Sequence, residues 1–354
     1  MFIKKEFEQT SIKKIVVLGI DQLGGLMMST PFFRELRIAY PDAYIVNLVG
    51  PLTYPIMQNC PYIDEVWRFD KKQSFKFVKQ FRTFGFDLAF LLAGTMRAAL
   101  IAFLGRVPHR IGFDADGTGR LLTIELRLSF SSRYRPENVF DFLRAVGVTP
   151  QGVYQREIWL SDANRDYALD WFKNYSQQKL LAFNPFSTDP KRRWTDSGWQ
   201  TLLDSLIPLN IRPIMLVAPN EVELAKDLLN SWHHQTNITV ESHSVTNTAA
   251  ILEYFDYVVG PESGFAHVAL AVNKPHVIAL FNVLPPKSTF PPDERHIGLI
   301  EDTLPCCPCY LYKFKDICPN GLVCMKQLGA ERVISTILQF EGVKNGATVG
   351  VTPL

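Results

Sequence analysis

Residues 257–267 read YVVGPESGFAH, and this stretch decides the fold class. Its first four residues are an apolar run typical of a buried strand, a glycine and a proline turn the chain, and a helix begins near Gly264. The free amides and the dipole at the start of such a helix attract anions, and Ser263 and Gly264 would let a phosphate approach closely. His267 lies on the first helical turn and could face the same anion. The alternative is an ordinary helix cap with a core histidine.

The pattern of a short apolar run followed by a helical stretch recurs along the whole chain, which is typical of βαβ units and parallel sheets. It restarts near residue 180, so the sequence predicts two α/β domains, residues 1–160 and 161–354. Ligands of such sheets bind beyond the carboxyl ends of the strands. The segment Arg110–Phe113 is expected to close the first sheet, and a helix is expected from about Asp196 to Leu206. Expected strands are residues 15–20, 44–49, 66–69, 86–92, 110–113, 180–184, 213–217, 238–240, 257–260 and 277–280.

The composition is that of a globular protein with a sizeable core, because 47% of the 354 residues are hydrophobic and 20% are charged. At about 150 residues per domain, this length fits two domains. A net charge of +2 argues against a dedicated nucleic-acid binder. The chain has no apolar run of about 18 residues that would predict a transmembrane helix, and its start lacks the apolar stretch of a signal peptide. A cytoplasmic location is therefore expected.

A second polar segment also lies between an expected strand and an expected helix. Residues 184–194 read NPFSTDPKRRW. The hydroxyls of Ser187 and Thr188, together with three consecutive cations that include Lys191 and Arg192, would suit a diphosphate beside a strand end. The alternative is a solvated basic loop, which is the more common meaning of a short run of charge.

Together, the two segments resemble motifs of glycosyltransferase family 9, the ADP-heptose lipopolysaccharide heptosyltransferases. Residues 262–267 are similar to the family's Asp-Thr-Gly-x-x-His motif, with Glu262 for the acid and Ser263 for threonine. Arg192 lies two residues before a tryptophan, like the basic residue of the family's phosphate loop. Further stretches that are similar to the family are residues 23–25, 29–31, 40–43, 110–113 and 271–281.

This resemblance implies a GT-B fold, an α/β architecture of two Rossmann-like domains that face a central cleft. The C-terminal domain would bind ADP-heptose, and the N-terminal domain would bind a lipopolysaccharide-core or other glycan acceptor. Such enzymes invert the anomeric centre by direct displacement while a carboxylate takes the proton of the acceptor hydroxyl. A different donor sugar or a protein acceptor are alternatives within this class. Glu262 would repel phosphate, so it would accept a sugar hydroxyl or orient the loop. By this resemblance, the donor contacts are Ser187, Thr188, Lys191, Arg192, Glu262, Ser263, Gly264 and His267.

The sequence departs from the family at the expected general base. The family has Gly-Asp at its opening turn, where this chain has Gly24 and Gly25 in a predicted glycine turn, and glycine cannot take a proton. Asp21 on the same loop is the first candidate for the base, although an aspartate there can also simply form the turn. Asp114 and Asp116 are the next candidates. The other interpretation is a sugar-nucleotide-binding protein, derived from this family, that does not catalyse.

Five of the six cysteines lie between residues 306 and 324, ahead of an expected terminal helix. In the cytoplasm these thiols would be reduced, so disulfides are not expected. Their spacing suits a structural zinc or iron ion held by four thiolates, with Cys307 as a substitute for the first of them. The alternative is a set of buried thiols without metal, and no cofactor is expected for the chemistry itself. The predicted metal ligands are Cys306, Cys309, Cys318 and Cys324.

Residues 71–82 read KKQSFKFVKQFR, which is both basic and aromatic. Phe75, Val78 and Phe81 fall on one helical face, so one interpretation is a helix that packs on the sheet with its lysines in water. The other interpretation is docking to an anionic membrane surface, where a lipid-linked acceptor would lie. The second would make the protein peripheral at the inner membrane.

Overall fold

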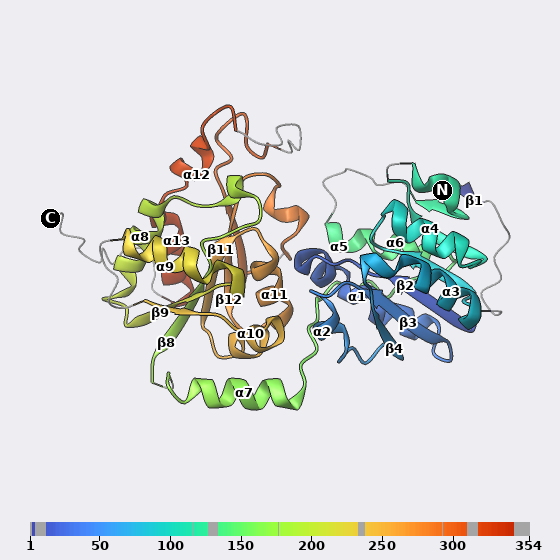
Figure 1. The fold of residues 1–354 in the computed structure, drawn as a ribbon. Coiled ribbons are helices and arrows are strands. Elements are labelled where there is room, and N and C mark those ends of the chain that lie inside the picture. Colours follow the sequence, from blue (N-terminus) through green and yellow to red (C-terminus); the bar gives the residue numbers. More distant parts are fainter. Residues whose placement is uncertain are drawn as a thin grey trace. The chain divides into compact units, whose positions relative to one another are not determined.

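The chain forms two compact units, Met1–Ser161 and Asp162–Leu354. In each unit, helices lie on both faces of a mainly parallel sheet (Figure 1). In the part of the chain that the structure describes, no helix is long and apolar enough to cross a membrane. The structure is a computed structural model that describes residues 2–3, 12–115, 117–126, 134–175, 177–232, 238–291, 293–309 and 318–342.

The sheet of the first unit has seven strands in the order β1-β7-β6-β5-β2-β3-β4. All neighbours are parallel except β1, which pairs with β7 in the antiparallel sense. The expectation that Arg110–Phe113 closes this sheet is wrong, because β7 and β1 extend it further. Both are too short to give a hydrophobic pattern in the sequence. The strands are β1 (Phe2–Ile3), β2 (Lys14–Leu18), β3 (Tyr44–Val49), β4 (Glu65–Arg68), β5 (Leu88–Leu91), β6 (His109–Phe113) and β7 (Ile124–Leu126).

Helix α1 begins at Leu23, so Gly24 and Gly25 lie in its first turn, and the prediction that they form a turn before the helix is wrong. Residues 19–22 make the actual turn. The helices of this unit are α1 (Leu23–Ala39), α2 (Tyr54–Met57), α3 (Ser74–Phe84), α4 (Met96–Leu104), α5 (Arg135–Asn138) and α6 (Phe140–Arg144), with 3-10 turns at Lys71–Gln73 and Thr118–Leu121.

Helix α3 packs on the sheet with Val78 and Phe81, as predicted, but its buried face includes Phe77 in place of Phe75. Phe77 and Phe81 are buried in the core of the unit, whereas Phe75 is 87% exposed. Lys76 and Lys79 are exposed as well. The pair of phenylalanines four residues apart fills the core, and Phe75 is left in solvent beside the lysines.

The second sheet has six parallel strands in the order β10-β9-β8-β11-β12-β13. The strands predicted for this half are all present. Strand β13 was not predicted, because its sequence HIGLI is short and contains a glycine. The strands are β8 (Lys179–Phe183), β9 (Ile211–Leu216), β10 (Thr239–Glu241), β11 (Tyr257–Pro261), β12 (His276–Phe281) and β13 (His296–Ile300).

Helix α8 spans Asp196–Leu206, as predicted, and begins where Thr195 accepts a hydrogen bond from the Gly198 amide at 3.1 Å. Threonine is a common residue at such a helix start, since its hydroxyl satisfies an amide that the helix leaves free. The other helices of this unit are α7 (Asp162–Phe172), α9 (Val222–Asn230), α10 (Val245–Leu252), α11 (Gly264–Val272), α12 (Val323–Gln327) and α13 (Ala330–Phe340), with 3-10 turns at Pro190–Arg192, Pro219–Glu221 and Pro286–Ser288.

Each sheet reverses its strand order once, and this reversal locates the candidate sites. In the second unit the chain builds β8, β9 and β10 toward one edge, then β11, β12 and β13 toward the other, so β8 and β11 are central neighbours. In the first unit the corresponding neighbours are β2 and β5. The loops that leave such neighbours diverge to opposite faces, and ligands of open α/β sheets bind in the crevice between them.

Candidate active site

Two loops flank the reversal point of the second sheet. One follows β8 and spans residues 184–195, and the other, Glu262 and Ser263, joins β11 to α11. The sequence predicts phosphate binding for both loops. Since the carboxyl ends of parallel strands lie at one edge of the sheet, the topology brings both loops to the same place.

A buried charge network joins the two loops. Arg192 forms an ion pair with Glu262 and also donates from Nη1 to the Glu262 carbonyl oxygen, at 3.1 Å. His267 Nε2 lies 3.1 Å from Glu262 Oε1. The side chains of Arg192, Glu262 and His267 are only 19%, 9% and 3% exposed. A carboxylate this deeply buried requires partners that replace its lost hydration, so the network holds the two loops at a fixed spacing.

Helix α11 begins at Gly264, directly after this network. Ser263 precedes it with extended backbone, and the Ser263 side chain does not cap the helix. The amides of the first helical turn have no acceptor within the helix, and the helix dipole adds partial positive charge there. The start of α11 therefore offers amides and a hydroxyl at the carboxyl end of β11, an arrangement suited to an anion.

The two adjacent arginines of the β8 loop point in different directions. Arg192 reaches Glu262, as described above. Arg193 instead donates from Nη2 to the Ser187 carbonyl oxygen at 3.1 Å, and its guanidinium group lies over the Phe186 ring, 5.5 Å from the ring centre. Of the two arginines, only Arg192 belongs to the network between the loops.

The remaining predicted donor contacts of this loop differ in exposure. Ser187 is buried, and its hydroxyl accepts a hydrogen bond from the Asp189 amide at 3.3 Å. Thr188 is exposed and Lys191 is half-buried. The loop thus presents Thr188 and Lys191 to solvent, whereas Ser187 helps to shape the loop.

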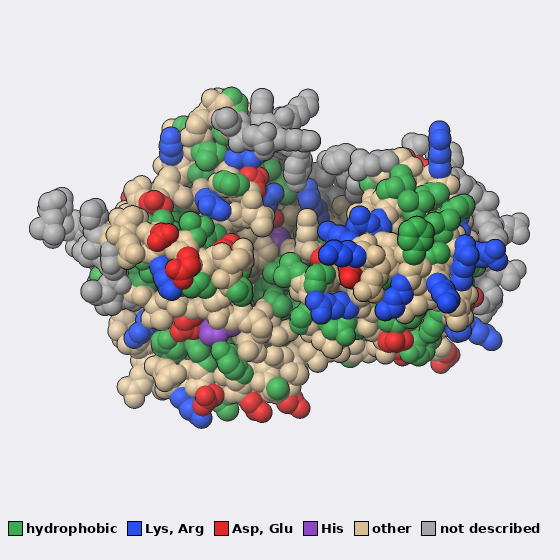
Figure 2. All heavy atoms as spheres, in the orientation of Figure 1, with side chains coloured by type: hydrophobic (Ala, Val, Ile, Leu, Met, Phe, Trp, Pro, Cys, Tyr) green, Lys and Arg blue, Asp and Glu red, His purple; other side chains and the backbone are tan. Residues whose placement is uncertain are grey.

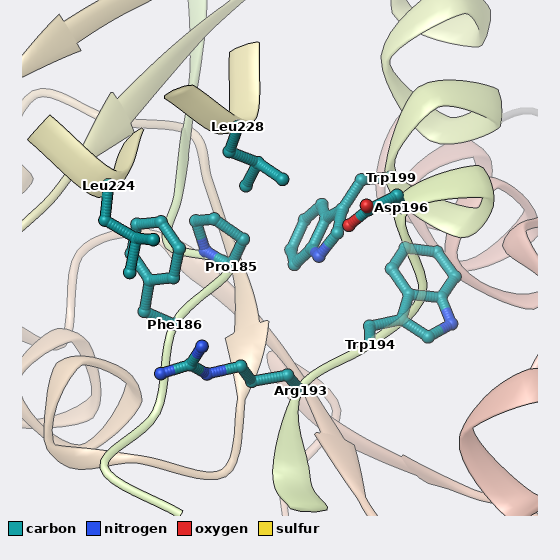
Figure 3. Close-up of a pocket in the computed structure, with 8 residues that line it drawn as sticks. All are labelled: Pro185, Phe186, Arg193, Trp194, Asp196, Trp199, Leu224 and Leu228. Atoms are coloured by element: carbon teal, nitrogen blue, oxygen red, sulfur yellow. The ribbon is translucent and has the colours of Figure 1, made fainter. Parts of the chain in front are cut away.

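An apolar groove lies on the helix side of the β8 loop, between α8 and α9, where Arg193 turns (Figure 3). Its volume is about 170 Å³, and neither Glu262 nor His267 lines it. Ligand pockets usually enclose about 300–1,000 Å³, so this groove is too small for a nucleotide sugar. Its residues are Pro185, Phe186, Arg193, Trp194, Asp196, Trp199, Leu224 and Leu228.

Two buried asparagines, to which the sequence motifs gave no role, shape the β8 loop. Asn184 donates to the Leu216 carbonyl oxygen at 2.8 Å and accepts from the Phe186 amide at 2.7 Å. Asn282 donates to the Lys191 carbonyl oxygen at 2.7 Å. Each asparagine directly follows a buried strand, β8 or β12. A single polar residue at the end of an apolar run is the signal that could have identified them.

Asp21 lies in the turn after β2, at the reversal point of the first sheet. It is exposed, and its Oδ1 accepts from the Leu52 amide at 3.1 Å and from the Thr53 hydroxyl at 3.4 Å. A Cβ atom on Gly50 would overlap the Asp21 carboxyl group, so a side chain at position 50 has to displace that carboxyl group. Asp21 therefore stabilises a turn and also presents a carboxylate at the edge of the sheet where ligands bind.

The other positions considered for the base are arranged differently. A Cβ atom on Gly25 would lie 2.7 Å from Ile20 Cγ2, so any side chain at position 25 has to displace Ile20. Asp114 follows β6 and accepts from the Gly119 amide at 2.8 Å. Asp116 lies outside the described residues.

A comparison of the whole chain with known families gives one decisive match. A family model described as glycosyltransferase family 9 (heptosyltransferase) matches residues 74–315, which is more than half of the 354 residues. The chain belongs to glycosyltransferase family 9. The predicted family and enzyme class are confirmed, and the protein is a glycosyltransferase.

Individual members of the family cover most of this glycosyltransferase. Lipopolysaccharide heptosyltransferase 2 of Escherichia coli K12 is 23% identical over 299 residues, which span 78% of this chain and 85% of that protein. A crystal structure of a family 9 glycosyltransferase from Veillonella parvula matches with a TM-score of 0.78 and 20% identity, over 94% of this chain and 98% of the other. The structure of E. coli ADP-heptose lipopolysaccharide heptosyltransferase II matches with a TM-score of 0.74 and 20% identity, over 93% and 99%. The predicted GT-B fold is confirmed.

In the part of the chain that the structure describes, the four predicted thiolates of this glycosyltransferase do not form a metal site, so the metal stays a prediction. All five cysteines of the loop fall within the described ranges, and there no three His, Cys, Asp or Glu side chains are placed to hold one metal ion. Instead Cys307 and Cys324 pack together in the core of the second unit, 7% and 9% exposed. The Cys307 thiol donates to the Asn282 carbonyl oxygen at 3.4 Å. Its contact with the Cys324 thiol lowers the pKa of Cys324 to about 6, while the same contact and burial raise the pKa of Cys307. Cys306, Cys309 and Cys318 are half-buried, and Cys306 and Cys309 lie near enough to Cys307 to contribute to its raised pKa.

The Arg192–Glu262 pair generates a prediction about stability. Arg192→Gln should lower the free energy of unfolding by roughly 3–5 kcal/mol, because it leaves a buried carboxylate without its cation. The double variant Arg192→Gln/Glu262→Gln should recover part of this loss. Urea unfolding of the single and double variants measures the coupling.

The control for this comparison of single and double variants is the ion pair of Lys226 and Glu223, whose side chains are 57% and 84% exposed. Their coupling should stay below about 0.5 kcal/mol, since water screens exposed pairs. Equal losses in the single and double variants at Arg192 and Glu262 would contradict a network that holds the loops together.

The cysteine arrangement generates a second prediction. Cys307→Ser should destabilise the protein by about 1–3 kcal/mol, because it places a hydroxyl in the core, whereas Cys306→Ser should change stability by less than about 0.5 kcal/mol. Thermal unfolding measures both, and elemental analysis of each variant reports zinc and iron. A large loss in Cys306→Ser, together with release of about one metal ion per chain, would restore the predicted set of thiolates.

Proposed function

We propose that the protein is an inverting heptosyltransferase that transfers a heptose from ADP-heptose to a lipopolysaccharide-core or other glycan acceptor. The observation that carries the proposal is the junction of the β8 and β11 loops through Arg192, Glu262 and His267 at the reversal point of the second sheet. The names of the relatives, lipopolysaccharide heptosyltransferase 2 and ADP-heptose lipopolysaccharide heptosyltransferase II, support the donor and the acceptor class.

The donor diphosphate would bind at the start of α11. The first amides of the helix, Gly264 and the Ser263 hydroxyl would contact its oxygens, with Thr188 and Lys191 on the opposite loop. Arg192 uses one guanidinium nitrogen for Glu262, and its planar group carries further N–H donors for phosphate. These donors would stabilise the charge that develops on the departing diphosphate.

Glu262 would act as a positioning residue for the diphosphate site. Its carboxylate would repel phosphate at close range, but in the structure it is paired with Arg192 and His267. The pairing orients the guanidinium group and the imidazole while it cancels much of the negative charge of the carboxylate. Contact of Glu262 with a sugar hydroxyl is compatible with the same position.

The reaction is a direct displacement. The acceptor hydroxyl oxygen attacks the anomeric carbon, the bond from that carbon to the diphosphate oxygen breaks, and ADP leaves from the opposite face, so the configuration inverts. A base takes the hydroxyl proton as the new bond forms, which is typically worth about 10²–10⁴ in rate. Asp21 is the carboxylate that we assign to this step, because it lies exposed at the reversal point of the first sheet.

The two units would divide the substrates. Residues 1–160 would hold the acceptor, and residues 161–354, with the cysteine-rich loop 306–324 and the terminal helix α13, would hold the donor. An acceptor carried on lipid would make the enzyme a cytoplasmic protein that works at the periphery of the inner membrane.

The proposal predicts the behaviour of a donor-site variant. Ser263→Ala/His267→Ala should weaken ADP binding by about tenfold or more, since it removes a hydroxyl donor and a partner of Glu262. It should also lower the thermal unfolding temperature, because His267 is buried against Glu262, so affinity is measured at a temperature at which the variant is folded. Calorimetry with ADP measures the affinity. Leu224→Ala, at an exposed position on α9, is the control and should bind ADP like the wild type.

The transfer itself is tested by ADP release from ADP-heptose with and without a lipopolysaccharide-core acceptor. Acceptor-dependent release that the double variant loses is the expected result. Unchanged ADP affinity in the double variant would place the donor elsewhere. Release from another nucleoside diphosphate sugar, but not from ADP-heptose, would overturn the assigned donor and leave the site in place.

The assignment of the base gives another prediction. Asp21→Asn should lower turnover by about 10²-fold or more with ADP affinity nearly unchanged, because the step that loses its proton acceptor follows donor binding. Gly50→Ala should cause a similar loss, since its Cβ atom displaces the Asp21 carboxyl group. Steady-state kinetics with saturating donor measures both variants.

Two comparisons make this test specific. Asp114→Asn should keep wild-type turnover, and a loss there with full activity in Asp21→Asn would move the base to Asp114. Gly25→Asp alone should be poorly tolerated because of Ile20, so the family residue is introduced with Ile20→Ala/Gly25→Asp. If the wild type is inactive with every donor and this double variant gains activity, the natural protein is a binding protein derived from an enzyme.

A further inference from the structure

Helices α3 and α4 of the first unit carry a surface that the proposed transfer chemistry does not use. Among the described residues, thirteen large hydrophobic side chains are exposed, and five of them lie on these two helices. On α4 they recur at helical spacing, so one whole face of that helix is apolar and in contact with solvent. The five are Phe75 (87% exposed), Met96 (40%), Leu100 (40%), Phe103 (45%) and Leu104 (39%).

The two helices present these side chains on one surface. The Arg82 guanidinium group on α3 donates from Nε to the Leu104 carbonyl oxygen on α4 at 2.8 Å, so the helices are neighbours. Lys79 and Phe75 precede Arg82 by three and seven residues and therefore lie on the same side of α3. Figure 2 shows hydrophobic side chains gathered over the region of α4, with Lys and Arg side chains around them.

Positive charge is concentrated in the same segment. Residues 71–110 contain eight Lys and Arg and one Asp, whereas the rest of the chain contains 29 Lys and Arg and 34 Asp and Glu. The single acid, Asp87, accepts hydrogen bonds from the amides of Lys13 and Lys14 at 2.9 and 2.8 Å. The segment thus carries almost no negative charge of its own, and the exposed Asp70 that precedes it accepts a hydrogen bond from the Lys72 amide at 2.9 Å. The exposed cations of the segment are Lys71, Lys72, Lys76, Lys79, Arg82, Arg97 and Arg106.

We propose that this basic apolar face, formed by the exposed side chains of α3 and α4, docks the protein on an anionic lipid bilayer. The apolar side chains of α4 would enter the boundary between headgroups and acyl chains, and the cations would lie at the level of the anionic headgroups. Apolar insertion and electrostatic attraction are each weak alone, and stable peripheral binding to a membrane generally combines the two. The strong local excess of cations favours a lipid surface over an apolar protein partner, because a negative surface complements it.

The position of this face fits a lipid-linked acceptor, a point that rests on the proposed function. Helix α4 begins at the carboxyl end of β5, the strand that lies beside β2. The basic apolar face therefore starts at the same edge of the first sheet as Asp21. Docking through this face would bring lipid headgroups to the edge where the acceptor is expected.

Flotation of the purified protein with lipid vesicles tests the proposal. The wild type should bind vesicles of phosphatidylcholine that contain phosphatidylglycerol far better than vesicles of phosphatidylcholine alone, and added salt should weaken the binding. Leu100→Ser/Phe103→Ser should weaken binding to the anionic vesicles by about tenfold or more. Lys72→Glu/Lys76→Glu/Lys79→Glu, which leaves the apolar side chains in place, should weaken it by roughly a hundredfold.

Matched controls come from the second unit. Leu169→Ser and Leu224→Ser change leucines that are 53% and 45% exposed, and both should bind vesicles like the wild type. All variants should keep wild-type ADP affinity, so a failure of this proposal is distinguishable from a failure of the donor site. Absent binding of the wild type to anionic vesicles, or equal binding by the variants at Leu100 and Phe103, would overturn the proposal. A wild-type dimer that Leu100→Ser/Phe103→Ser converts to a monomer would also overturn it and identify a contact between copies of the chain.

Discussion

Glu262 is a carboxylate almost out of contact with water, at the end of a central strand, and it lies between Arg192 and His267. Desolvation makes an unpaired charge in this position very costly, so the loop that supplies Arg192 and the helix that supplies His267 have to meet at Glu262. Through this one constraint, the ends of β8 and β11 and the start of α11 become a single structural unit. Asn184 and Asn282 extend the constraint, because their amides fix the backbone of the loop that carries Arg192.

The strands of the two sheets could be predicted from the sequence because most are buried on both faces and read as continuous apolar runs. Strand β11, for example, is buried along its whole length and is bounded by turn residues. The prediction was wrong where this contrast is lost. Strand β7 has three residues, and strand β13 contains a glycine and is only partly buried, so neither gives a distinct run. The two glycines of α1 resemble a turn, and only the packing of the helix shows that they belong to its first turn.

The site shows a different limit of prediction from sequence. Both loops that flank the reversal point of the second sheet could be identified, because a strand followed by small and basic residues has a clear local pattern. The direction of each side chain could not, since it depends on partners from distant segments. Arg192 and Arg193 are adjacent and chemically alike, yet one pairs with Glu262 and the other covers Phe186. In the same way Cys307, rather than its neighbour Cys306, packs against Cys324 in the core.

At the reversal point of the first sheet, the space available to a side chain differs between positions 25 and 21. The resemblance to the family predicts a carboxylate at position 25, but there Ile20 fills the space that a Cβ atom would occupy. At Asp21, four residues earlier, a carboxylate has room. Gly50 has no side chain, and the Asp21 carboxyl group occupies the space where a Cβ atom of residue 50 would lie. Ile20 and Asp21 both lie in the turn between β2 and α1. The Ile20 side chain packs on Gly25, and the Asp21 carboxyl group packs on Gly50. The turn therefore holds a carboxylate at the carboxyl edge of the first sheet through the Leu52 amide, although position 25 carries none.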